Sequence, residues 1–567
     1  MRNNNVLESI AKQSGDEFYT PIPKGYKPGR TKYVVVTGSV MSGIGKGTIN
    51  SCLCKLLQDR GMKVEPIKLE AYLNVDAGTL NPYRHGEVFV LDDGTETDLD
   101  LGSYERMLDK NLGKDNFVTS GRIYQSIVEK ERAGRYLGRD VQFIPHVTGE
   151  IKMVLRQLAV KTKADVIVIE IGGTVGDYEN MFALEAIREL IYEEGKNNVC
   201  FVNVTYILQP KSLGEHKSKA AQLGIKRLIE LGIQPDIIVC RSETPAPKKI
   251  KEKISLNVNV PIDRVIGVDD ISNIYALPLK LRNIGYDETV LEVLGISKKF
   301  RSNGNGKLAK WTAKNTVREN SKPITIGIAG KYTGSSDTYI SVLNALDHAA
   351  TLIGRKVMVK WIETTDLESN NKKIAHELKN VKGIIVPGGF GARGIEGKIK
   401  VAKHCREKNI PYLGLCLGFQ IAVIEFARNL CNLKNANSTE FNPKTRHPVV
   451  DTLPEQKKIG KLGGSMRLGG RDVEIKQGTK AFKLYDARSA RERFRHRYEC
   501  NPEYIQLLEK KGMVFSGKDP HHPIMQILEL PKHRFYMATQ YHAEFTSRPL
   551  KPSPLFLGFV KAAANRK

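Results

Sequence analysis

Cysteine is scarce in this sequence, and its positions are scattered. The 567 residues include 8 cysteines, and no pair has the CxxC spacing that zinc ligands favour. A disulfide scaffold is therefore excluded, a zinc site is not expected, and the pattern is typical of a reducing cytosol. No apolar run approaches the roughly 18 residues of a membrane-spanning helix, and residues 1–30 lack the apolar core of a signal peptide. The sequence predicts a soluble cytoplasmic protein.

Acidic residues are outnumbered by basic ones. The 62 Asp and Glu residues stand against 88 Lys and Arg residues, which gives a net charge of +26. Such a balance suits nucleic acids, anionic membranes or small polyphosphate substrates. The alternative is a solvated basic surface, and because no RNP, helix-turn-helix or zinc-finger pattern accompanies the charge, a nucleic-acid partner is not expected. Without a long apolar run, no membrane is expected either. The hydrophobic fraction of 41% is that of a globular protein, and the length implies about two or three domains.

Two regions with α/β character flank a basic segment. Short β-branched runs alternate with helical stretches from Tyr33 to Leu294, which predicts βαβ units on a parallel sheet. Residues 298–322 hold eight basic residues, one acidic residue and a Gly/Asn cluster, a composition typical of a linker. A second α/β region follows it. We therefore expect an N-terminal extension (1–30), a first domain (31–297), a basic linker (298–322) and a second domain (323–567).

The segment YVVVTGSVMSGIGKGT predicts a phosphate-binding loop between a strand and a helix. Gly43, Gly45 and Gly47 allow backbone N–H groups to converge on an anion at the helix N-terminus, and Lys46 adds a point charge. The match to a standard P-loop is imperfect, because Val40 stands where the first glycine belongs. The alternative is a tight strand–helix turn with a surface lysine.

Carboxylates and further lysines accompany this loop. Glu170 lies at the carboxyl end of the apolar run DVIVIE, and Asp100 lies in the acidic segment TDLDLG. Mg²⁺ prefers one or two carboxylates together with phosphate oxygens, so this pair is a candidate metal site. Lys217, Lys219 and Lys253 suggest a second polyanionic ligand, although each alone is more typical of a solvated surface.

The second region carries thiol chemistry. IPYLGLCLGFQ predicts a strand followed by a turn that exposes Cys416 at a helix N-terminus, the cysteine version of a nucleophile elbow. The next backbone N–H would stabilise an oxyanion. MATQYHAEF supplies His542 as a base and Glu544 as the carboxylate that orients it. The alternative is a buried structural cysteine and an unrelated histidine.

These motifs, with NVDAGT, HGEVFVLDDG, EIGGTVGD, PGGFGARG, NANSTEF and RHRYE, resemble the CTP synthase family over residues 31–563. In that family a P-loop amidoligase is joined to a class I glutamine amidotransferase. The resemblance implies two α/β domains, a parallel-sheet domain similar to dethiobiotin synthetase and a class I glutamine amidotransferase domain. It also implies ATP-dependent amination of UTP to CTP, a step of pyrimidine nucleotide biosynthesis, with ammonia from glutamine.

The resemblance further implies roles for individual residues. Cys416, His542 and Glu544 would be catalytic, and Asp100 and Glu170 would hold Mg²⁺. ATP would be bound by Gly43, Ile44, Gly45, Lys46, Gly47, Thr48, Asp100, Asp269, Asp270 and Ile271. UTP or the inhibitor CTP would be bound by Ser42, Asp177, Tyr178, Glu179, Lys217, Ser218, Lys219, Ala220, Ala221, Gln222 and Lys253. Glutamine would be bound by Gly389, Leu417, Gly418, Phe419, Gln420, Glu440 and Arg497. Family members are activated by GTP and form homotetramers, so we expect a homotetramer here, with filaments as a further assembly.

Two alternatives share parts of this pattern. A related P-loop amidoligase that acts on a carboxylate would keep Lys46 and Cys416, but it has no need of the lysine-rich pyrimidine loop. A non-enzymatic filament-forming or RNA-binding relative would be expected to have lost some of Lys46, Glu170, Cys416, His542 and Glu544, all of which are present.

Overall fold

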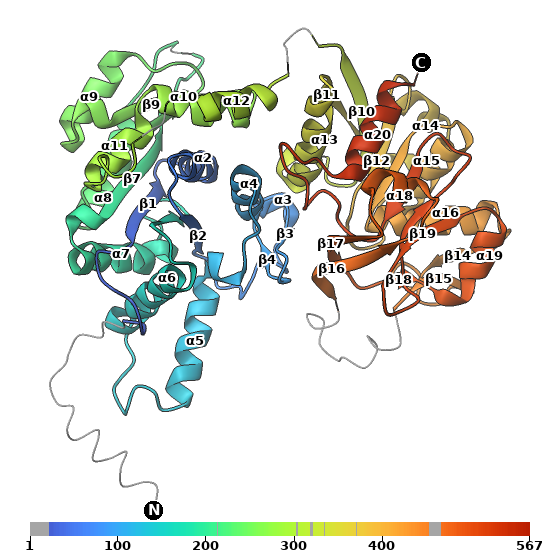
Figure 1. Ribbon diagram of the computed structural model, residues 1–567, viewed down its shortest axis with the longest axis horizontal. Helices are drawn as coiled ribbons and strands as arrows, with labels where there is room; N and C mark the ends of the chain where they lie inside the picture. Colours follow the sequence, from blue (N-terminus) through green and yellow to red (C-terminus); the bar gives the residue numbers. More distant parts are fainter. Residues whose placement is uncertain are drawn as a thin grey trace, which may run out of the picture. The chain divides into compact units, whose positions relative to one another are not determined.

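The computed structural model describes residues 22–212, 214–301, 304, 306–317, 321–333, 335–369, 371–452 and 466–566. The chain divides into two compact units, Met1–Thr79 with Ser103–Ala313 and Leu80–Gly102 with Lys314–Lys567 (Figure 1). The predicted N-terminal extension falls outside the described residues up to position 21. Each unit is an α/β structure, so the predicted fold class is confirmed.

The first unit is built on a parallel sheet. Its strands are apolar and β-branched because both faces of a parallel sheet are covered by helices. Among the described residues the order across the sheet is β5 (Phe117–Thr119), β2 (Val64–Glu70), β6 (Val166–Ile171), β1 (Lys32–Gly38), β7 (Val199–Tyr206), β8 (Ile237–Ser242) and β9 (Val265–Asp269). Every pair is parallel. The carboxyl ends of the strands therefore share one edge, where ligand-binding loops gather.

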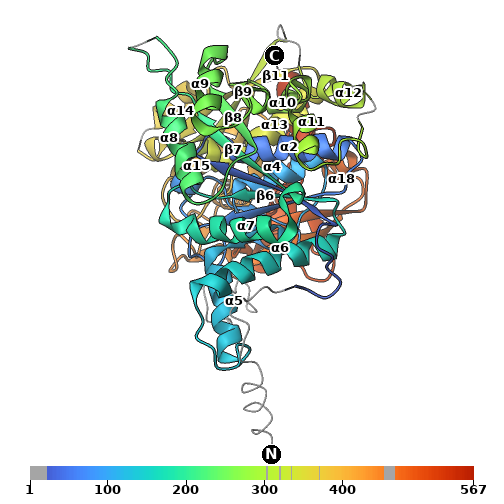
Figure 2. The ribbon, with the colours of Figure 1, turned by 90° about the vertical axis from the view of Figure 1, so that its left-hand side faces the viewer.

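Two helical layers cover this sheet (Figure 2). Val34 and Val36 of β1 pack in one apolar core with α2, α10 and α11, whereas Tyr33 and Val35 pack in the other with α5, α6 and α7. The alternation follows from the two-residue period of a strand. The helices are α2 (Lys46–Asp59), α5 (Ser120–Arg132), α6 (Thr148–Thr162), α7 (Met181–Glu194), α8 (Lys219–Glu230), α9 (Lys248–Val258), α10 (Leu277–Asn283), α11 (Tyr286–Val293) and α12 (Gly306–Lys314).

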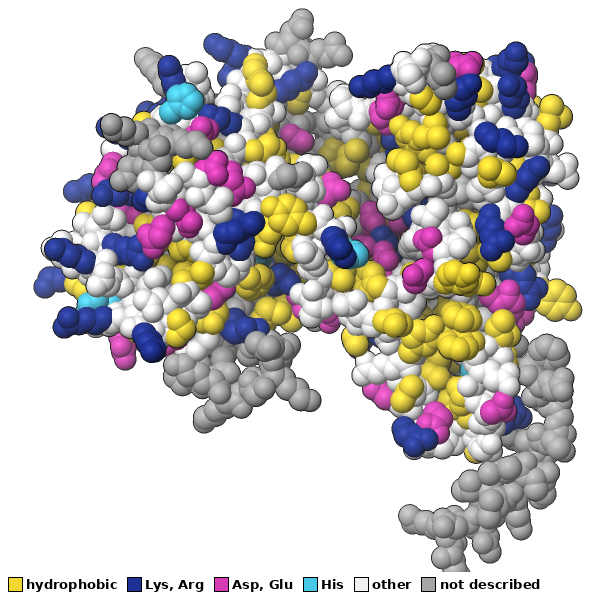
Figure 3. Space-filling model, turned by 180° about the vertical axis from the view of Figure 1, so that it is seen from behind, with side chains coloured by type: hydrophobic (Ala, Val, Ile, Leu, Met, Phe, Trp, Pro, Cys, Tyr) yellow, Lys and Arg dark blue, Asp and Glu magenta, His cyan; other side chains and the backbone are white. Residues whose placement is uncertain are grey.

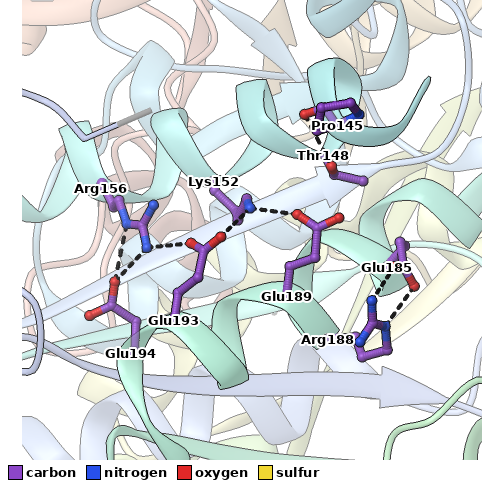
Figure 4. Close-up of polar contacts among 9 residues, drawn as sticks. All are labelled: Pro145, Thr148, Lys152, Arg156, Glu185, Arg188, Glu189, Glu193 and Glu194. Carbon is purple, nitrogen blue, oxygen red and sulfur yellow. Dashed lines mark hydrogen bonds and ion pairs between the residues drawn. The ribbon is translucent and has the colours of Figure 1, made fainter. Parts of the chain in front are cut away.

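A buried ionic network joins α6 to α7 (Figure 4). The Lys152 ammonium lies 2.5 Å from a Glu193 carboxylate oxygen, and the Arg156 guanidinium lies 2.7 Å from Glu193 and 2.8 Å from Glu194. The backbone N–H of Gly29 donates to Glu194 Oε2 at 3.0 Å. Removal of one partner from such a network typically costs about 3–5 kcal/mol, because the remaining charge stays buried. The network therefore holds the segment before β1 against the helix layer.

Part of the segment for which we expect a linker is a packed helix. Within α12, Leu308 is buried in the core of the first unit. The Trp311 ring lies 5.9 Å from the Tyr275 ring, and the Lys55 ammonium lies 4.9 Å from the Trp311 ring centroid. The basic composition of this segment concealed one apolar helical face.

The second unit is built on a mixed sheet. Among the described residues its order is β11 (Lys356–Glu363), β10 (Pro323–Gly330), β12 (Gly383–Val386), β13 (Tyr412–Leu415), β21 (Tyr536–Thr539), β20 (Met525–Glu529), β19 (Val514–Lys518), β16 (Arg467–Ile475) and β17 (Ser489–His496). The first five are parallel and the remainder antiparallel. A smaller sheet contains β14 (Ala436–Ser438), β15 (His447–Asp451) and β18 (Glu499–Cys500).

The helices of this unit again form two layers. Side chains of α15 and α16 pack in one core, and those of α13 and α20 pack in the other. The helices are α13 (Ile340–Leu352), α14 (Asn371–Glu377), α15 (Ile395–Glu407), α16 (Leu417–Asn429), α18 (Lys480–Tyr485), α19 (Ile505–Lys510) and α20 (Pro554–Ala564).

Residues 80–102, which the sequence analysis places in the first domain, pack with the second unit. They contain α3 (Pro82–His85), the hairpin strands β3 (Phe89–Val90) and β4 (Glu96–Thr97), and the start of α4 (Leu99–Leu108). The Gly470 N–H donates to the Asp92 carbonyl at 2.8 Å, and Arg491 pairs with the Asp92 carboxylate at 2.9 Å. These contacts join the hairpin to β16 and β17.

The surface shows no single band of positive charge on the face drawn in Figure 3, where the described Lys and Arg side chains are spread among Asp and Glu. No helix in the described part of the chain is long and apolar enough to span a membrane.

Candidate active sites

The turn between β1 and α2 has the geometry of an anion-binding loop. Gly43 and Gly45 have φ angles of 72° and 85°, a region in which glycine is favoured. Gly45, which has no side chain that could cap the helix, precedes α2, and the first N–H groups of a helix point out of its N-terminal end. Val40 also has a positive φ, 83°. A valine therefore adopts a glycine-like conformation where the sequence departs from the standard P-loop.

Lys46, the first residue of α2, reaches a second glycine-rich loop. Its ammonium donates to the carbonyl of Gly173, which follows β6. In the same loop Asp177 Oδ2 accepts from the Thr174 N–H at 2.7 Å, and the Val175 N–H donates to the Gly38 carbonyl at 2.8 Å. The loops after β1 and β6 are thus joined, and Asp177 lies in the second of them.

Arg241, which sequence reasoning missed, supports the phosphate loop from the end of β8. Its guanidinium donates to the Ile44 carbonyl at 3.3 Å and pairs with Asp270 at 2.5 Å. A Cβ at Gly45 would lie 2.4 Å from Arg241 Nη1, so a larger residue would displace the guanidinium as well as strain the backbone, whose φ is 85°. The available signal was an arginine at the carboxyl end of a buried strand, directly after DIIVC.

The three residues expected beside adenine lie at the end of β9. The Asp269 carboxylate pairs with Lys280 at 2.6 Å, and this hydrogen bond is the main cause of its lowered pKa. Asp270 pairs with Arg241, and Ile271 is partly buried against the core that contains α2. Both carboxylates therefore have cationic partners on the phosphate-loop side of the sheet.

Glu170 is 1% exposed at the end of β6 and lies in a charged cluster. The Tyr104 hydroxyl donates to it, Lys68 Nζ lies 3.4 Å from it, and Lys68 also pairs with Glu70 at 3.0 Å. Sequence reasoning missed Tyr104, which lies just beyond TDLDLG. Asp100 belongs to the second compact unit, so its pairing with Glu170 stays a prediction.

The donor chemistry around Glu170 suits Mg²⁺. No group of three or more His, Cys, Asp or Glu residues in the described ranges has a metal-binding arrangement. Mg²⁺ does not require one, because it takes one or two carboxylates and completes its shell with water and phosphate oxygens. Glu170 is a buried carboxylate at the carboxyl end of β6. The phosphate loop follows β1 at the same edge of the sheet, so Glu170 meets this need.

The lysines expected to bind a pyrimidine nucleotide lie near one another. Lys217 forms an ion pair with Glu215. The pKa of Glu215 is lowered mainly by the hydrogen bond from Lys217, and the charges of Lys217 and Lys253 lower it further. Lys219 begins α8 and is exposed. A Cβ at Gly224 of α8 would lie 2.7 Å from the Ser39 Cβ, so this helix packs closely on the start of the phosphate loop.

The neighbouring candidates differ in where their side chains point. Gln222 Nε2 donates to Ser218 Oγ at 3.0 Å, and both side chains are buried. Ala221 is fully buried in an apolar cluster with α9, so its side chain faces the core. Tyr178 is 84% exposed. The remaining candidates of this set, Ser42, Glu179 and Ala220, are exposed or partly exposed.

Cys416 occupies a strained turn between β13 and α16. Its backbone has φ 52° and ψ −99°, which is unusual for a residue with a side chain. Its N–H donates to the Thr539 carbonyl at 2.7 Å. A Cβ at Gly418 would lie 2.1 Å from the Val386 carbonyl, so a glycine is required where the helix meets β12. Close packing thus holds the thiol at the start of a helix.

His542 and Glu544 lie beside this turn. His542 Nδ1 is 2.7 Å from Glu544 Oε1, and His542 Nε2 has no hydrogen-bond partner among the described residues. Burial lowers the pKa of His542, but the negative charge of Glu544 and the neighbouring Cys416 outweigh it and raise the pKa to about 10. A Cβ at Gly388 would lie 2.8 Å from His542 Cε1 and 3.6 Å from the Cys416 Cβ. The loop after β12 therefore approaches both groups.

Several residues expected to bind glutamine lie at the Cys416 turn and on the loop after β12. A Cβ at Gly389 would lie 3.5 Å from Leu417 Cδ2, and Gln420 Nε2 donates to the Tyr498 carbonyl at 3.0 Å. Phe419 is fully buried in the apolar core, so only its backbone faces the turn.

Glu440 lies against the loop that follows β12, and the charge of Arg497 acts on it. Glu440 Oε1 accepts from the Gly391 N–H at 2.7 Å. Burial raises the pKa of Glu440, and the charges of Lys331 and Arg497 act against that shift. Sequence reasoning missed Lys331, which follows a strand in ITIGIAGKY and donates to the Phe390 carbonyl.

Comparison with known proteins gives the family. Residues 32–296 match the family described as CTP synthase N-terminus, and residues 335–562 match glutamine amidotransferase class-I. CTP synthase of Pyrococcus abyssi is 49% identical over 538 residues, which cover 95% of this chain and 98% of the relative. The chain belongs to the CTP synthase family. CTP synthase of Bacillus subtilis is 47% identical over 541 residues, covering 95% of this chain and 100% of that protein.

A solved structure adds a further likeness. The glutaminase domain of Trypanosoma brucei CTPS with bound acivicin is 38% identical, has a TM-score of 0.41, and covers 43% of this chain and 95% of that one.

Membership of the CTP synthase family confirms the predicted enzyme class. The family consists of glutamine-hydrolysing ligases that use ATP to convert UTP to CTP. UTP, ATP and glutamine are therefore the substrates, and the carboxylate-directed and non-enzymatic alternatives are set aside.

Proposed function

We propose that Cys416, His542 and Glu544 hydrolyse glutamine. The observation that carries this assignment is the strained Cys416 turn beside a histidine whose Nδ1 is hydrogen-bonded to a buried carboxylate. His542 takes the thiol proton at Nε2 and becomes the imidazolium that Glu544 stabilises, and the thiolate attacks the side-chain amide carbon of glutamine. The backbone N–H groups of Leu417 and Gly389 stabilise the oxyanion. His542 then returns the proton to the leaving ammonia, and water hydrolyses the thioester.

The phosphate loop is assigned to ATP. N–H groups from Gly43 to Thr48 surround the phosphates, Lys46 neutralises charge on the terminal ones, and Arg241 fixes the loop through the Ile44 carbonyl. Glu170 and Asp100 would hold Mg²⁺, which spreads the charge that develops on phosphate oxygens. A Glu170→Gln variant should need a higher Mg²⁺ concentration for half-maximal activity, and unchanged Mg²⁺ dependence would contradict this role.

UTP is assigned to the adjoining surface. Lys217, Lys219 and Lys253 supply positive charge for its triphosphate, close to the phosphate loop on which α8 packs. The uracil 4-oxygen accepts the phosphoryl group, because a carbonyl oxygen is a poor leaving group and phosphate is a good one. Ammonia then displaces the phosphate.

Assembly and regulation are part of the same proposal. An apolar groove in the first unit exposes Leu73 (70%), Val128 (58%), Phe143 (56%) and Tyr178 (84%), a surface suited to burial in a homotetramer. We expect cytoplasmic location, GTP activation of glutamine hydrolysis, and a tetramer promoted by ATP and UTP because their phosphates neutralise the lysines. Light scattering that shows a tetramer at low protein concentration without nucleotide would contradict the last point.

One assay tests the proposed division of roles. The absorbance change as UTP becomes CTP is recorded with ATP, Mg²⁺ and either glutamine or ammonium as the nitrogen source. The proposal requires both sources to work in the intact enzyme. Loss of ammonium-dependent synthesis in a folded variant that lacks only the thiol would overturn it.

A further inference from the structure

Three aromatic rings lie in a row that ends on the histidine. The Phe545 ring lies 4.8 Å from the His542 ring at an interplanar angle of 10°. The Phe89 ring packs on Phe545 in a tilted arrangement, with the ring centroids 5.0 Å apart and an interplanar angle of 60°. Phe89 is 0% exposed and Phe545 is 2% exposed. One face of the imidazole is therefore covered by Phe545, which is in turn backed by a residue 456 positions earlier in the chain.

Phe89 is held firmly in this place. It lies on the hairpin of β3 and β4, and its carbonyl accepts from Thr97 Oγ1 at 2.9 Å. Arg493 Nη1 donates to the Val90 carbonyl at 3.1 Å, and the Arg493 guanidinium lies 5.5 Å from the Phe89 ring centroid. The carbonyl of the same Arg493 accepts the His542 N–H at 2.8 Å. The hairpin is thus connected with His542 in two ways, through the rings of Phe89 and Phe545 and through the contacts of Arg493.

Ion pairs fix the remainder of the hairpin to the same strand. Arg491 pairs with Asp92 at 2.9 Å, and Arg495 pairs with Glu96 at 2.7 Å. Arg491, Arg493 and Arg495 alternate along β17, so their side chains share one face of that strand. Cys416 Sγ lies 3.6 Å from the Arg495 carbonyl. The strand that carries the hairpin therefore also contacts the thiol.

We propose that Phe89 is a positioning residue for glutamine hydrolysis. Through Phe545 it holds the His542 imidazole in the plane that directs Nε2 at the Cys416 thiol. The assignment rests on the proposed triad. It is unexpected from the sequence, since Phe89 lies within the part of the chain that matches the CTP synthase N-terminus and not within the amidotransferase match. A residue of the segment that matches the CTP synthase N-terminus thereby helps to hold the proposed base of the glutaminase site in place.

This role follows from the fact that proton transfer requires the base and the proton donor to be placed within a narrow range of distances and angles. A base must lie within hydrogen-bond reach of its proton, and a displacement of about 1 Å can cost about a hundredfold in rate. Removal of the Phe89 ring would leave a cavity behind Phe545, and the imidazole could then tilt away from the thiol. Binding of glutamine would change little, because its recognition groups lie on other loops.

The test uses the full-length enzyme and three variants. In Phe89→Ala we expect the glutaminase kcat to fall at least tenfold, the KM for glutamine to change less than twofold, and ammonium-dependent CTP synthesis to stay within twofold of the original. Phe89→Leu, which refills most of the volume, should recover part of the lost kcat. The matched control is Phe559→Ala, which removes a fully buried ring of the same unit that packs on Phe535 and should leave kcat unchanged.

Alkylation of Cys416 by iodoacetamide, followed by mass spectrometry, supplies a second readout and should slow in Phe89→Ala. An unchanged glutaminase kcat in folded Phe89→Ala would overturn the proposal, as would an equal loss of kcat in Phe559→Ala. If Phe89→Ala does not fold, Phe545→Leu is measured instead, with the same expected split between kcat and KM. Glutaminase activity that survives in Cys416→Ala would show that the triad itself is wrong, which separates the two failures.

Discussion

His542 Nδ1 lies 2.7 Å from Glu544 Oε1 inside the second unit, and the Glu544 side chain is 3% exposed. A buried carboxylate beside an imidazole favours the imidazolium, and it also fixes which ring nitrogen faces the thiol. The same hydrogen bond therefore contributes to the stability of the second unit and orients the proposed base.

This relationship predicts a pH dependence of stability. The pKa of His542 is raised from 6.5 to about 10 in the folded protein, because burial, which lowers the pKa, is outweighed by the charge of Glu544 and then by the interactions with Cys416. Between these pH values the folded state retains a proton that the unfolded state has lost. The stabilisation is therefore complete below about pH 6.5 and is lost as pH rises toward 10, by at most about 1.4 kcal/mol per pH unit.

Thermal unfolding from pH 6.5 to 10 measures this effect. The midpoint of the unmodified protein should fall more steeply with pH than that of Glu544→Gln, in which the imidazolium has lost its partner. Parallel curves for the two proteins would show that Glu544 does not hold the proton on His542.

Substitution of Cys416 should separate the two nitrogen sources. Cys416→Ala removes the nucleophile that forms the thioester but leaves the phosphate loop intact. We expect no CTP from glutamine and near-normal CTP from ammonium at alkaline pH, where free ammonia is more abundant. His542→Ala should behave in the same way, because base and nucleophile act as a unit. The control is Cys431→Ala, which changes a buried cysteine just beyond the C-terminal end of α16 and should keep both activities.

Substitution of Lys46 should abolish synthesis from either source. Without its charge on the terminal phosphates the uracil oxygen is not activated, and we expect a loss on the order of a hundredfold or more in CTP formation. Lys55→Ala on the same helix is the matched control, since Lys55 lies over Trp311 and away from the loop. Normal ammonium-dependent synthesis in Lys46→Ala would rule out the phosphate-loop assignment.

Substitution of Arg241 should weaken ATP binding and leave the basal glutaminase activity unchanged. In Arg241→Ala the Ile44 carbonyl loses its donor and Asp270 loses its partner, so the loop becomes less ordered. We expect the KM for ATP to rise about tenfold, which corresponds to about 1.4 kcal/mol. Arg227→Ala, which breaks an exposed ion pair with Glu230, should leave the KM unchanged. An equal effect of both variants would point to net charge instead of loop geometry.

Much of both sites could be predicted from the sequence because their geometry is local. The phosphate loop and the Cys416 turn are each encoded within about a dozen contiguous residues, where glycines permit positive φ angles and the flanking apolar runs form a strand and a helix. The fold class followed for the same reason, since alternating strand and helix patterns are properties of short windows.

Only the tertiary structure decided which distant residues support these sites and which neighbours do not. Arg241 reaches the phosphate loop because β8 and β1 end at the same edge of one sheet. Phe89 packs on Phe545, beside His542, because the hairpin of β3 and β4 is bound to β17. Ala221 and Phe419 stand inside site motifs but face the core, since the rotation of a helix about its axis is set by what it packs on. Local sequence specifies the conformation of a loop, whereas its partners are chosen by burial and hydrogen bonding across the whole chain, which no short window contains.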